Sequence, residues 1–407
     1  MARIVMKFGG TSVADVDRIK HVARKVKTAV EAGDQVAVVV SAMAGVTNQL
    51  VDHVRKTAQL YDLREYDAIV ASGENVTAGL LAIALQDLGV PARSWQGWQV
   101  PVITDGAHGA ARIERIETTE LRRRLAQGEV AVVAGFQGLE PVRNRISTLG
   151  RGGSDTSAVA LAAALEADRC DIYTDVDGVY TSDPRVVKGA RKLDKITYEE
   201  MLEMASLGAK VLQTRSVEMA MKHRVRVQVL SSFEDKPGTL VVDEDEIVEK
   251  EVVSGVTLSR DEAKITLRRV PDRPGVAAAI FGPLADASIN VDMIVQNTGA
   301  DSEHTDLTFT VQRGDLGRAV KVLSDNAEHL GHAAMLSDAN VVKISVIGVG
   351  MRSHAGVAQK MFKTLSEKGI NIQVITTSEI KVSVLIAEEY AELALRSLHT
   401  AYGLDSV

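Results

Sequence analysis

The stretch Lys7-Phe8-Gly9-Gly10-Thr11-Ser12 decides how this chain begins to fold. It follows the apolar run Ile4–Met6, which predicts a buried strand. It precedes apolar residues at helical spacing, which predict a helix capped by Ser12 or Asp15. Two glycines let a polyanion approach the backbone N–H groups, while the helix N-terminus and Lys7 supply positive charge. This order of elements indicates a phosphate site.

The same stretch has a simpler interpretation, which is a surface lysine beside a Gly-Gly turn without a ligand. No G-x-x-x-x-G-K-[ST] sequence occurs in the chain, so the stretch is not a Walker loop. On this stretch alone the two interpretations are balanced, because short glycine motifs arise often by chance.

Composition narrows the class of protein. The chain has 407 residues, enough for two or three domains, and 45% apolar with 25% charged residues is ordinary for a globular protein. Aromatic residues are scarce at 4%, so Ala, Val and Leu must fill the core, which suits α/β layers. The net charge of −7 argues against nucleic-acid binding, which usually needs a basic surface.

The sequence also predicts a cytoplasmic protein with no membrane partner. Its one cysteine, Cys170, cannot form an intrachain disulfide, and its apolar surroundings predict a buried structural thiol. No run of about 18 apolar residues is present, so no membrane span is expected. The N-terminus leads directly into the first expected strand, without a signal peptide.

Residues 1–230 alternate between strand-like and helix-like segments. Continuous apolar strands between helices are typical of a mainly parallel sheet that is covered on both faces. Besides the first strand and helix, the expected strands are Gln35–Ser41, Val130–Phe136, Asp171–Thr174 and Arg226–Leu230, and the expected helices are Gly73–Leu88 and Ser154–Ala167.

The composition shifts at Phe233–Lys250, where few apolar residues lie and acidic residues gather. We expect a linker and a domain boundary there. The alternative is a short charged helix on the surface of the first domain.

An internal repeat follows this segment. Gly275-Val276-Ala277 precedes Ile289-Asn290-Val291, and Gly356-Val357-Ala358 precedes Ile370-Asn371-Ile372. The asparagine follows the glycine by 15 residues in both copies, and the copies lie 81 residues apart. Each copy shows the pattern strand, helix, strand, strand, which indicates a duplicated β-α-β-β unit.

A second glycine motif, Arg151–Ser157 (RGGSDTS), precedes an alanine-rich helix that Ser154 or Asp155 can cap. The functional interpretation is another anion site, in which Arg151 holds a carboxylate through its fork of donors. A capped helix after a loop is the alternative, but it explains only the serine. We therefore favour the functional interpretation.

Two acidic motifs, Asp175–Tyr180 and Asp183-Pro184-Arg185, follow the next expected strand. A calcium loop of the EF-hand type is excluded, because Val179 stands where a third oxygen ligand should be. A nucleotide-facing loop fits better, with a carboxylate for the ribose, the tyrosine for packing and the arginine for phosphate. A plain Asp-Gly turn is the alternative for Asp177.

Three further polar residues lie where open α/β sheets bind ligands. Ser41 and Thr47 flank the small-residue loop Ala42–Gly45, which follows an expected strand. Glu74 begins an expected helix, where its charge suits the helix dipole, and that role alone would explain it.

Taken together, these motifs resemble those of the aspartate kinase family, within the amino-acid kinase superfamily. Besides Lys7–Ser12, the matching segments in family order are Ser41–Thr47, Ser72–Glu74, Arg151–Asp155 and Asp175–Tyr180. The internal repeat resembles the paired ACT domains that bind regulatory amino acids. The resemblance covers almost the whole chain, and five ordered motifs are far more specific than any one of them.

The resemblance implies an α/β fold with a three-layer amino-acid kinase domain (carbamate-kinase-like) and a mainly parallel sheet, plus two ferredoxin-like βαββαβ ACT domains. The boundaries that we expect are 1–232 for the catalytic domain, 233–250 for the linker, 251–335 for the first ACT domain and 336–407 for the second. The exposed sheet edges of ACT units lead us to expect a homo-oligomer.

The resemblance also implies a reaction, in which MgATP phosphorylates the β-carboxylate of L-aspartate to 4-phospho-L-aspartate. This would start the synthesis of lysine, threonine, methionine and diaminopimelate. The catalytic residues would be Lys7, Arg151 and Asp155. The substrate-binding residues would be Ser41, Thr47, Glu74, Arg151, Gly152, Ser154 and Asp155. The ATP-binding residues would be Lys7, Gly9, Gly10, Ser12, Thr174, Asp175, Tyr180, Arg185 and Lys210, with Mg²⁺ arriving on ATP and no metal ligand assigned to a side chain.

Feedback by lysine and/or threonine at the ACT pair is implied as well. The effector-binding residues would be Asp272, Gly275, Val276, Gln296, Val357, Asn371, Ile372, Ser378 and Glu379. An ordinary turn before a strand is the alternative for Asn371, as it is for Asn290.

Two other functions are open to such a chain. One is a kinase for a different acidic substrate, such as acetylglutamate, against which the repeat and the amine-binding carboxylates argue. The other is an amino-acid sensor with an inert kinase domain, against which Lys7, Arg151 and Asp155 argue.

Overall fold

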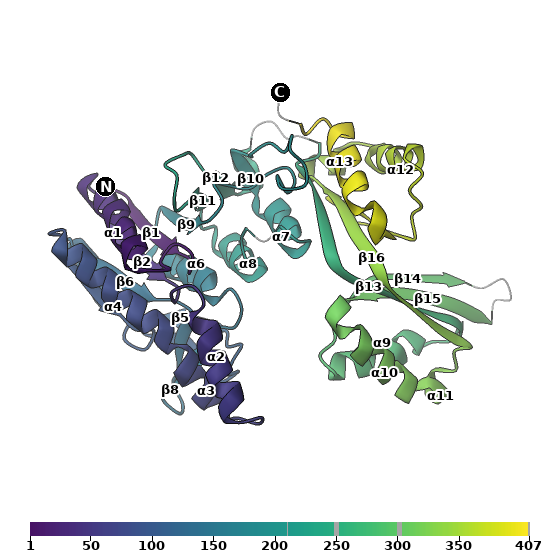
Figure 1. Ribbon diagram of the computed structural model, residues 1–407, viewed down its shortest axis with the longest axis horizontal. Coiled ribbons are helices and arrows are strands. Elements are labelled where there is room, and N and C mark those ends of the chain that lie inside the picture. Colours follow the sequence, from purple (N-terminus) through teal and green to yellow (C-terminus); the bar gives the residue numbers. More distant parts are fainter. Residues whose placement is uncertain (210, 248–251, 299–302, 406–407) are drawn as a thin grey trace. The chain divides into compact units, whose positions relative to one another are not determined.

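The computed structural model describes residues 1–209, 211–247, 252–298 and 303–405, and Figure 1 labels their elements. They form two compact units. The first comprises Met1–Val179, Lys192–Ala205 and Lys210–Glu249, and the second comprises Tyr180–Arg191, Ser206–Ala209 and Lys250–Val407. Lys210, which we expected to face the nucleotide, lies outside the described residues.

The first unit is built on a sheet with the strand order β10-β12-β11-β9-β1-β2-β6-β3. β1 pairs in parallel with both β2 and β9, and its apolar residues are buried, as expected for a central strand covered on both faces. Within this sheet, β11 and β12 form the antiparallel pair. The strands are β1 (Arg3–Phe8), β2 (Gln35–Val40), β3 (Ala92–Trp95), β6 (Val130–Ala134), β9 (Arg169–Thr174), β10 (Lys195–Thr197), β11 (Val227–Ser231) and β12 (Thr239–Val242).

Successive side chains of β1 point to opposite faces of the sheet, so they pack against different helices. Ile4, Met6 and Phe8 pack into a core cluster with residues of α1 and α4. Lys7 therefore lies on the opposite face, which α6 covers. The helices of the first unit are α1 (Val16–Glu31), α2 (Val46–Thr57), α3 (Leu63–Val70), α4 (Ser72–Asp87), α5 (Thr119–Ala126), α6 (Gly153–Leu165), α7 (Tyr198–Ser206) and α8 (Thr214–His223).

A smaller sheet of the first unit has the order β5-β4-β7-β8. β7 and β8 form a hairpin, and α3 packs against β8 (Figure 1). The strands are β4 (Val102–Thr104), β5 (Ile113–Ile116), β7 (Gln137–Glu140) and β8 (Arg145–Thr148).

The helices α3 and α4 form one apolar stretch, Leu63–Asp87, which by length and composition alone could cross a membrane. No membrane span was expected from the sequence, and polar residues such as Glu74 interrupt the apolar ones in this stretch. Half of the 18 most apolar consecutive residues of the stretch are buried within the protein, and Leu81 and Leu85 belong to the core cluster under β1 and β2. The stretch therefore packs as a core helix.

The segment 233–250, expected to be a linker, contains part of the first sheet. Thr239–Val242 forms β12, and the Thr239 hydroxyl accepts from the Val179 N–H at 2.8 Å and donates to the Leu193 carbonyl at 2.6 Å. A short 3-10 helix, Glu244–Glu246, follows. The charged residues near this four-residue strand, of which only three residues are apolar, concealed it in the sequence.

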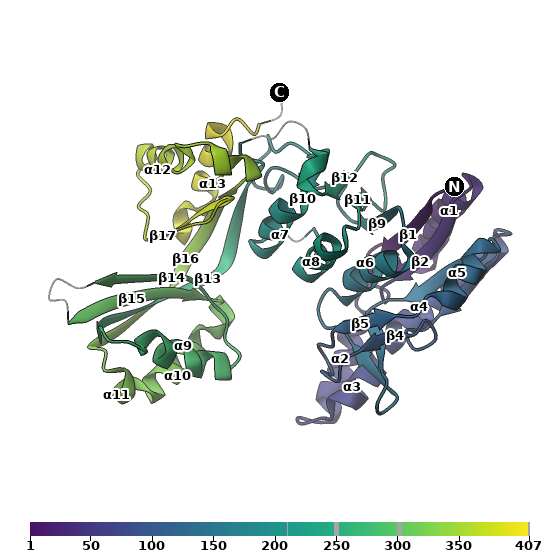
Figure 2. The ribbon, with the colours of Figure 1, turned by 180° about the vertical axis from the view of Figure 1, so that it is seen from behind.

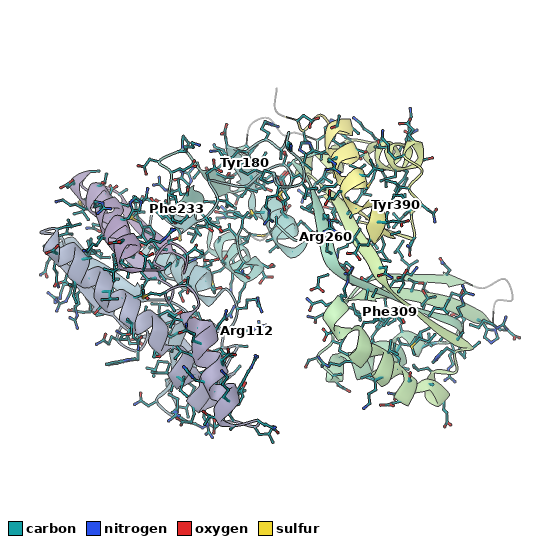
Figure 3. The ribbon with its side chains drawn as sticks, viewed as in Figure 1. Arg112, Tyr180, Phe233, Arg260, Phe309 and Tyr390 are labelled. Carbon is teal, nitrogen blue, oxygen red and sulfur yellow. The ribbon has the colours of Figure 1, made fainter. Side chains whose placement is uncertain are left out.

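The second unit is an antiparallel sheet with the order β14-β15-β13-β16-β18-β17. Helices cover it in two groups, as Figure 2 shows. The Phe309 side chain of β15, labelled in Figure 3, packs edge-on against Phe281 of α9 with 5.2 Å between ring centroids. The elements are β13 (Gly255–Pro271), α9 (Val276–Asp286), β14 (Val291–Thr298), β15 (His304–Val311), α10 (Leu316–Asp325), α11 (Ala327–Leu330), β16 (Ala334–Ile347), α12 (Val357–Glu367), β17 (Val374–Thr377), β18 (Lys381–Ala387) and α13 (Ala391–Ala401), with 3-10 helices at Arg313–Asp315, Val349–Ser353 and Glu388–Tyr390.

The long strand β13 serves both copies of the repeat. Its first part, including Val256, packs into a cluster with α12 and α13, whereas its second part, including Ile265, packs into a cluster with α9 and α10. The two ACT-like modules are therefore not separated by a single cut between residues 335 and 336, because residues near 256 contribute to the core of the second copy.

The segment Tyr180–Arg191 packs with the second unit although its neighbours on both sides belong to the first. Val187 lies in the cluster of α12 and α13, and the Thr181 carbonyl accepts from the Val256 N–H at 2.8 Å. The Thr181 hydroxyl bonds to Nε2 of buried His399 at 2.8 Å.

Candidate active site

A buried ion pair lies at the carboxyl end of β1. Nζ of Lys7 is 2.5 Å from Oδ1 of Asp155 in the first turn of α6, and the two side chains are 10% and 11% exposed. Taking two charges out of water is costly, so such a pair is weak evidence for stability and a good marker of function. The sequence motifs had placed each residue in a separate glycine loop, and the fold brings the two loops together.

The glycines after β1 permit close backbone packing. A Cβ atom at Gly10 would lie 3.0 Å from the Ala42 carbonyl oxygen, and one at Gly9 would lie 3.3 Å from Nζ of Lys7. The Gly9 N–H donates to the Tyr173 carbonyl at 3.4 Å. The loop therefore lies between the ends of β2 and β9, the position at which open α/β sheets bind ligands.

The residue that caps α1 is Asp15, whose side chain accepts from the Arg18 N–H at 2.8 Å. Ser12 is buried and bonds through its hydroxyl to the Ser232 hydroxyl at 2.5 Å. The Ser232 N–H donates to the Thr174 carbonyl at 2.8 Å, which ties the glycine loop to the end of β9. Ser232 was not singled out from the sequence, although a polar pair directly after a strand was a usable signal.

Glu74 faces the loop after β2 rather than solvent. It is 3% exposed, and its Oε1 accepts from the Ala42 N–H at 3.0 Å. Its Oε2 is buried and has no hydrogen-bond partner among the residues that the structure describes. Burial raises the pKa of the Glu74 carboxyl to about 7. A helix-dipole role does not account for a buried, half-satisfied carboxylate, and a site for a cationic group does.

The Arg151 loop is shaped by left-handed glycines on both sides, with φ of 75° at Gly150 and 72° at Gly152. A Cβ atom at Gly152 would lie 2.1 Å from the Gln213 side chain, so only glycine fits there. Arg151 is exposed and makes no hydrogen bond or ion pair with any described residue. Its guanidinium is therefore available to an anion.

The other expected substrate residues lie around the same strand ends. Ser154 is buried, and a Cβ atom at Gly135, after β6, would lie 3.0 Å from its Cβ. Ser41 follows β2 directly and its N–H donates to the Phe8 carbonyl at 3.1 Å. Thr47 lies in the first turn of α2.

The residues expected to face the nucleotide divide between the two units. Thr174 ends β9 and donates to the exposed carboxylate of Asp175 at 3.1 Å. Tyr180, labelled in Figure 3, and Arg185 belong to the second unit. Arg185 pairs with Asp183 at 2.8 Å, and this hydrogen bond lowers the pKa of the Asp183 carboxyl.

Among the expected effector residues, Val276 and Val357 occupy equivalent positions in the two repeats. Gly275 and Gly356 both adopt left-handed φ, at 91° and 97°, directly before α9 and α12. Val276 and Val357 begin these helices, and Asp272 follows β13. The edge strands β14 and β17 contact each other. The other expected residues lie on or next to these two strands: Gln296 in β14, Asn371 and Ile372 before β17, and Ser378 and Glu379 after it.

Within the described ranges, no group of three or more His, Cys, Asp or Glu side chains could hold a metal ion. Cys170 is fully buried, and burial raises the pKa of its thiol, which suits the structural role expected for it.

Comparisons with known proteins identify the family and the fold. Residues 2–231 match the amino acid kinase family, and residues 268–326 and 344–402 match an ACT domain family. The chain is 57% identical over 408 residues to the aspartokinase of Pseudomonas aeruginosa, covering 100% of this chain and 98% of that protein.

Two solved structures of Escherichia coli aspartokinase III are also similar. The complex with aspartate and ADP (R-state) has a TM-score of 0.81 and 29% identity, covering 98% of this chain and 99% of that one. The complex with lysine and aspartate (T-state) has a TM-score of 0.78 and 28% identity, covering 98% of each chain.

The fold, the site at the strand ends and the two family matches together define an amino acid kinase that carries two ACT domains. Within this class, the chain belongs to the aspartate kinase family. It is thus an ATP-dependent phosphotransferase with a carboxyl acceptor, and the fold class and the family expected from the sequence are confirmed.

Proposed function

We propose that this chain phosphorylates the β-carboxylate of L-aspartate with MgATP to give 4-phospho-L-aspartate. The observation that carries the proposal is the Lys7–Asp155 pair at the end of β1, together with the half-satisfied Glu74 beside the loop after β2, the strand next to β1. The Escherichia coli relative was solved with aspartate and ADP, which supports the same pair of ligands here.

The charges of the site suit an acidic amino acid. Arg151 has a guanidinium available for the α-carboxylate, and Glu74, together with Asp155, offers carboxylate oxygens to the α-ammonium. Ser41, Thr47, Gly152 and Ser154 complete the proposed substrate site.

Phosphoryl transfer needs positioning and charge neutralisation more than a covalent catalyst. Lys7 is the cation in our proposal that lets the carboxylate meet the transferring phosphoryl group. The Gly9–Gly10 backbone would approach the phosphates, with the Gly10 N–H as the donor, because the Gly9 N–H already donates to the Tyr173 carbonyl. Asp155 pairs with Lys7 and so holds it in place. Ser12, Thr174, Asp175, Tyr180, Arg185 and Lys210 are proposed for the rest of the nucleotide.

Mg²⁺ would be held chiefly by the phosphates of ATP, because the described residues offer no metal cluster. It would neutralise phosphate charge, while this chain positions the two anions.

Regulation and context form the rest of the proposal. Lysine and/or threonine would act as effectors at the ACT modules, and lysine is bound in one of the Escherichia coli structures. The enzyme would act in the cytoplasm, as a homo-oligomer assembled through its ACT modules, at the first step toward lysine, threonine, methionine and diaminopimelate.

A coupled ADP-release assay with L-aspartate and with N-acetylglutamate tests the function. We expect turnover with L-aspartate alone. Turnover with N-acetylglutamate and none with aspartate would support the related amino-acid kinase instead, and none with either would support a non-catalytic sensor.

A further inference from the structure

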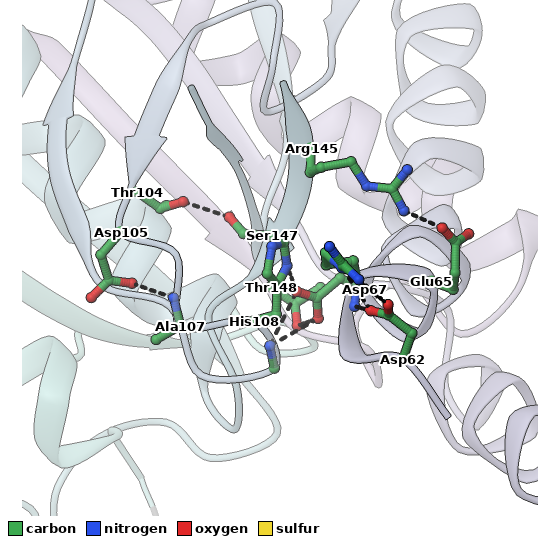
Figure 4. Close-up of polar contacts among 12 residues, drawn as sticks. Asp62, Glu65, Asp67, Thr104, Asp105, Ala107, His108, Arg145, Ser147 and Thr148 are labelled. Carbon is green, nitrogen blue, oxygen red and sulfur yellow. Dashed lines mark hydrogen bonds and ion pairs between the residues drawn. The ribbon is translucent and has the colours of Figure 1, made fainter. Parts of the chain in front are cut away.

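A second buried carboxylate lies beside the candidate active site without belonging to it. Asp67, on α3, is 0% exposed and accepts hydrogen bonds from three side-chain or backbone groups (Figure 4). Both of its oxygens accept from the Gly109 N–H at 3.1 Å. Its Oδ2 also accepts from Nδ1 of His108 at 2.7 Å, and its Oδ1 accepts from the Thr148 hydroxyl at 2.5 Å.

Each of these partners adjoins a segment of the candidate site. Thr148 ends β8, three residues before Arg151. The carbonyl of Gly109 packs against Gly150, where a Cβ atom would lie only 3.1 Å from it. Asp67 therefore fixes both the strand that leads into the Arg151 loop and the backbone on which that loop rests.

Asp67 is also tied to the helix that bears Glu74. Its own helix, α3, meets α4 at Ala71, three residues before Glu74. The Ala71 carbonyl accepts from the Gln137 side chain at 3.0 Å, which fixes this junction to β7. One carboxylate thus connects the two segments that we assign to opposite ends of the substrate.

The loop that carries His108 and Gly109 is held from a second side. Arg215 of α8 donates to the Ala111 carbonyl at 2.7 Å and to the Leu149 carbonyl at 2.8 Å. The His108 side chain is 8% exposed, with Nδ1 bonded to Asp67 and Nε2 buried. His108 therefore acts through Asp67.

A buried carboxylate is a costly way to hold three segments together, since apolar side chains would do so without desolvating a charge. Directional hydrogen bonds supply what apolar contacts do not, a fixed spacing between the segments. The guanidinium of Arg151 and the carboxylate of Glu74 must match the distance between the α-carboxylate and the α-ammonium of one amino acid.

We propose that Asp67 is a positioning residue that sets Arg151 and Glu74 at the spacing an α-amino acid requires. This inference rests on the proposed function, because that function assigns the two residues to the two ends of aspartate. It predicts that the cluster of Asp67, His108, Gly109 and Thr148 controls the KM for aspartate and leaves the KM for ATP unchanged.

The decisive variant is Asp67→Asn, which keeps the shape and removes the charge and one acceptor. We expect the KM for aspartate to rise by about tenfold or more, because small displacements of positioning groups are costly. The KM for ATP should stay within about twofold, since the variant leaves the β1 loop intact.

Glu140→Gln is the matched control. Glu140 is 3% exposed and its carboxylate accepts from the N–H groups of Val142 and Arg143 at 2.8 and 3.0 Å. It lies in the same small sheet at the far end of the β7–β8 hairpin. Its substitution should lower the melting temperature without changing the KM for aspartate.

A pair of variants at His108 tests the positioning role of Asp67 even if Asp67→Asn does not fold. His108→Asn retains an N–H donor near the position of Nδ1, and His108→Ala removes it. The KM for aspartate should rise in His108→Ala and return toward the wild-type value in His108→Asn.

An unchanged KM for aspartate in folded Asp67→Asn, or equal values in the two His108 variants, overturns the inference and makes the cluster merely structural. In those outcomes an active wild-type enzyme leaves the proposed function standing. A wild-type enzyme that does not phosphorylate aspartate overturns both.

Discussion

Asp67 and Glu74 are buried carboxylates on consecutive helices, and they differ in how completely they are satisfied. Asp67 accepts from three neighbouring groups on other segments. Glu74 accepts one backbone N–H from another segment, and its Oε2 has no partner in the part of the chain that the structure describes. Burial raises the pKa of Glu74 to about 7. The saturated carboxylate holds the structure together, and the unsaturated one can receive a ligand.

The free energy of burial explains why carboxylates with an unpartnered oxygen, such as Glu74, are rare. A buried polar group without a partner costs about 1–3 kcal/mol, so it persists where binding a ligand requires it. Arg151 is the cationic counterpart of Glu74. It is exposed, and its side chain makes no hydrogen bond or ion pair with the described residues. Substituting fully hydrogen-bonded groups should therefore affect stability, and substituting groups with unpartnered polar atoms should affect substrate binding.

The largest effect should come from Lys7, the cation of the buried pair. Lys7→Ala removes a charged donor that would stabilise the transferring phosphoryl group, so kcat should fall by at least about a hundredfold. Lys27→Ala is the control, because Lys27 lies on α1, which covers the sheet face opposite α6, and it donates to the Leu88 carbonyl at 3.1 Å. Steady-state kinetics measure both, and near-normal turnover in Lys7→Ala would refute the role assigned to it.

Glu74→Gln should sharpen the comparison through substrate affinity. The amide keeps an acceptor for the Ala42 N–H and loses the charge that would hold the α-ammonium. Since hydrogen bonds to charged groups contribute about 1.5–3 kcal/mol, the KM for aspartate should rise by about 10- to 100-fold. A KM for aspartate equal to that of the wild type would return Glu74 to a purely structural role.

The pH dependence of affinity is the next test. The ionised form of Glu74 is the one that binds an ammonium group, and its pKa of about 7 lies in the working range. The KM for aspartate should therefore rise as the pH falls through about 7, approaching tenfold per unit. Initial rates between pH 5.5 and 8.5, at about 25 °C, measure this, and Glu74→Gln should lack the inflection.

The raised pKa of Glu74 also predicts that the stability of the fold increases as the pH falls, whereas the affinity for aspartate decreases. The folded pKa of Glu74, about 7, lies above its ordinary value of 4.5, so its contribution favours folding below pH 4.5 and is lost as the pH rises through 7. Glu74→Gln should thus melt at a higher temperature than the wild type at pH 8. Calorimetry should show this difference shrinking toward pH 5, and a lower melting temperature for the variant at pH 8 would contradict it.

The smallest effect is expected at His399 in the second unit. Burial lowers the pKa of its imidazole from 6.5, and Thr181, Asp405 and Arg191 are the groups that face it. Its contribution to stability is present above pH 6.5 and is lost as the pH falls below it. The melting temperature should drop more between pH 7.5 and 6 in the wild type than in His399→Gln, and equal drops would exclude His399 as the cause.

Much of the fold could be predicted from the sequence, because its signals are local. The apolar runs around Val5, Val38 and Val132 predicted parallel strands, and these form the centre of the first sheet. The strand Thr239–Val242 was missed, because a threonine and three apolar residues close to charged ones resemble a surface segment. The spacing of the repeat predicted two similar modules, yet not that β13 serves both.

Part of the candidate site could also be predicted from the sequence, because some of its signals are local. Glycine motifs mark Lys7 and Arg151 because the chain needs glycine where backbones approach closely or φ is positive. Asp67 and His108 carry no motif, and a single acidic residue in an amphipathic helix looks like any exposed one. Their roles follow from burial and from partners that lie far along the chain.

The sequence by itself determined the order of the main elements, the family and the two glycine loops that we propose as anion sites, because strand alternation, helix spacing and glycine each act over a few residues. Tertiary structure alone decided that Lys7 meets Asp155, that Glu74 keeps an oxygen without a described partner and that Tyr180–Arg191 packs with the second unit. Burial and hydrogen-bond satisfaction depend on groups brought from distant positions, and no local pattern records which groups those are.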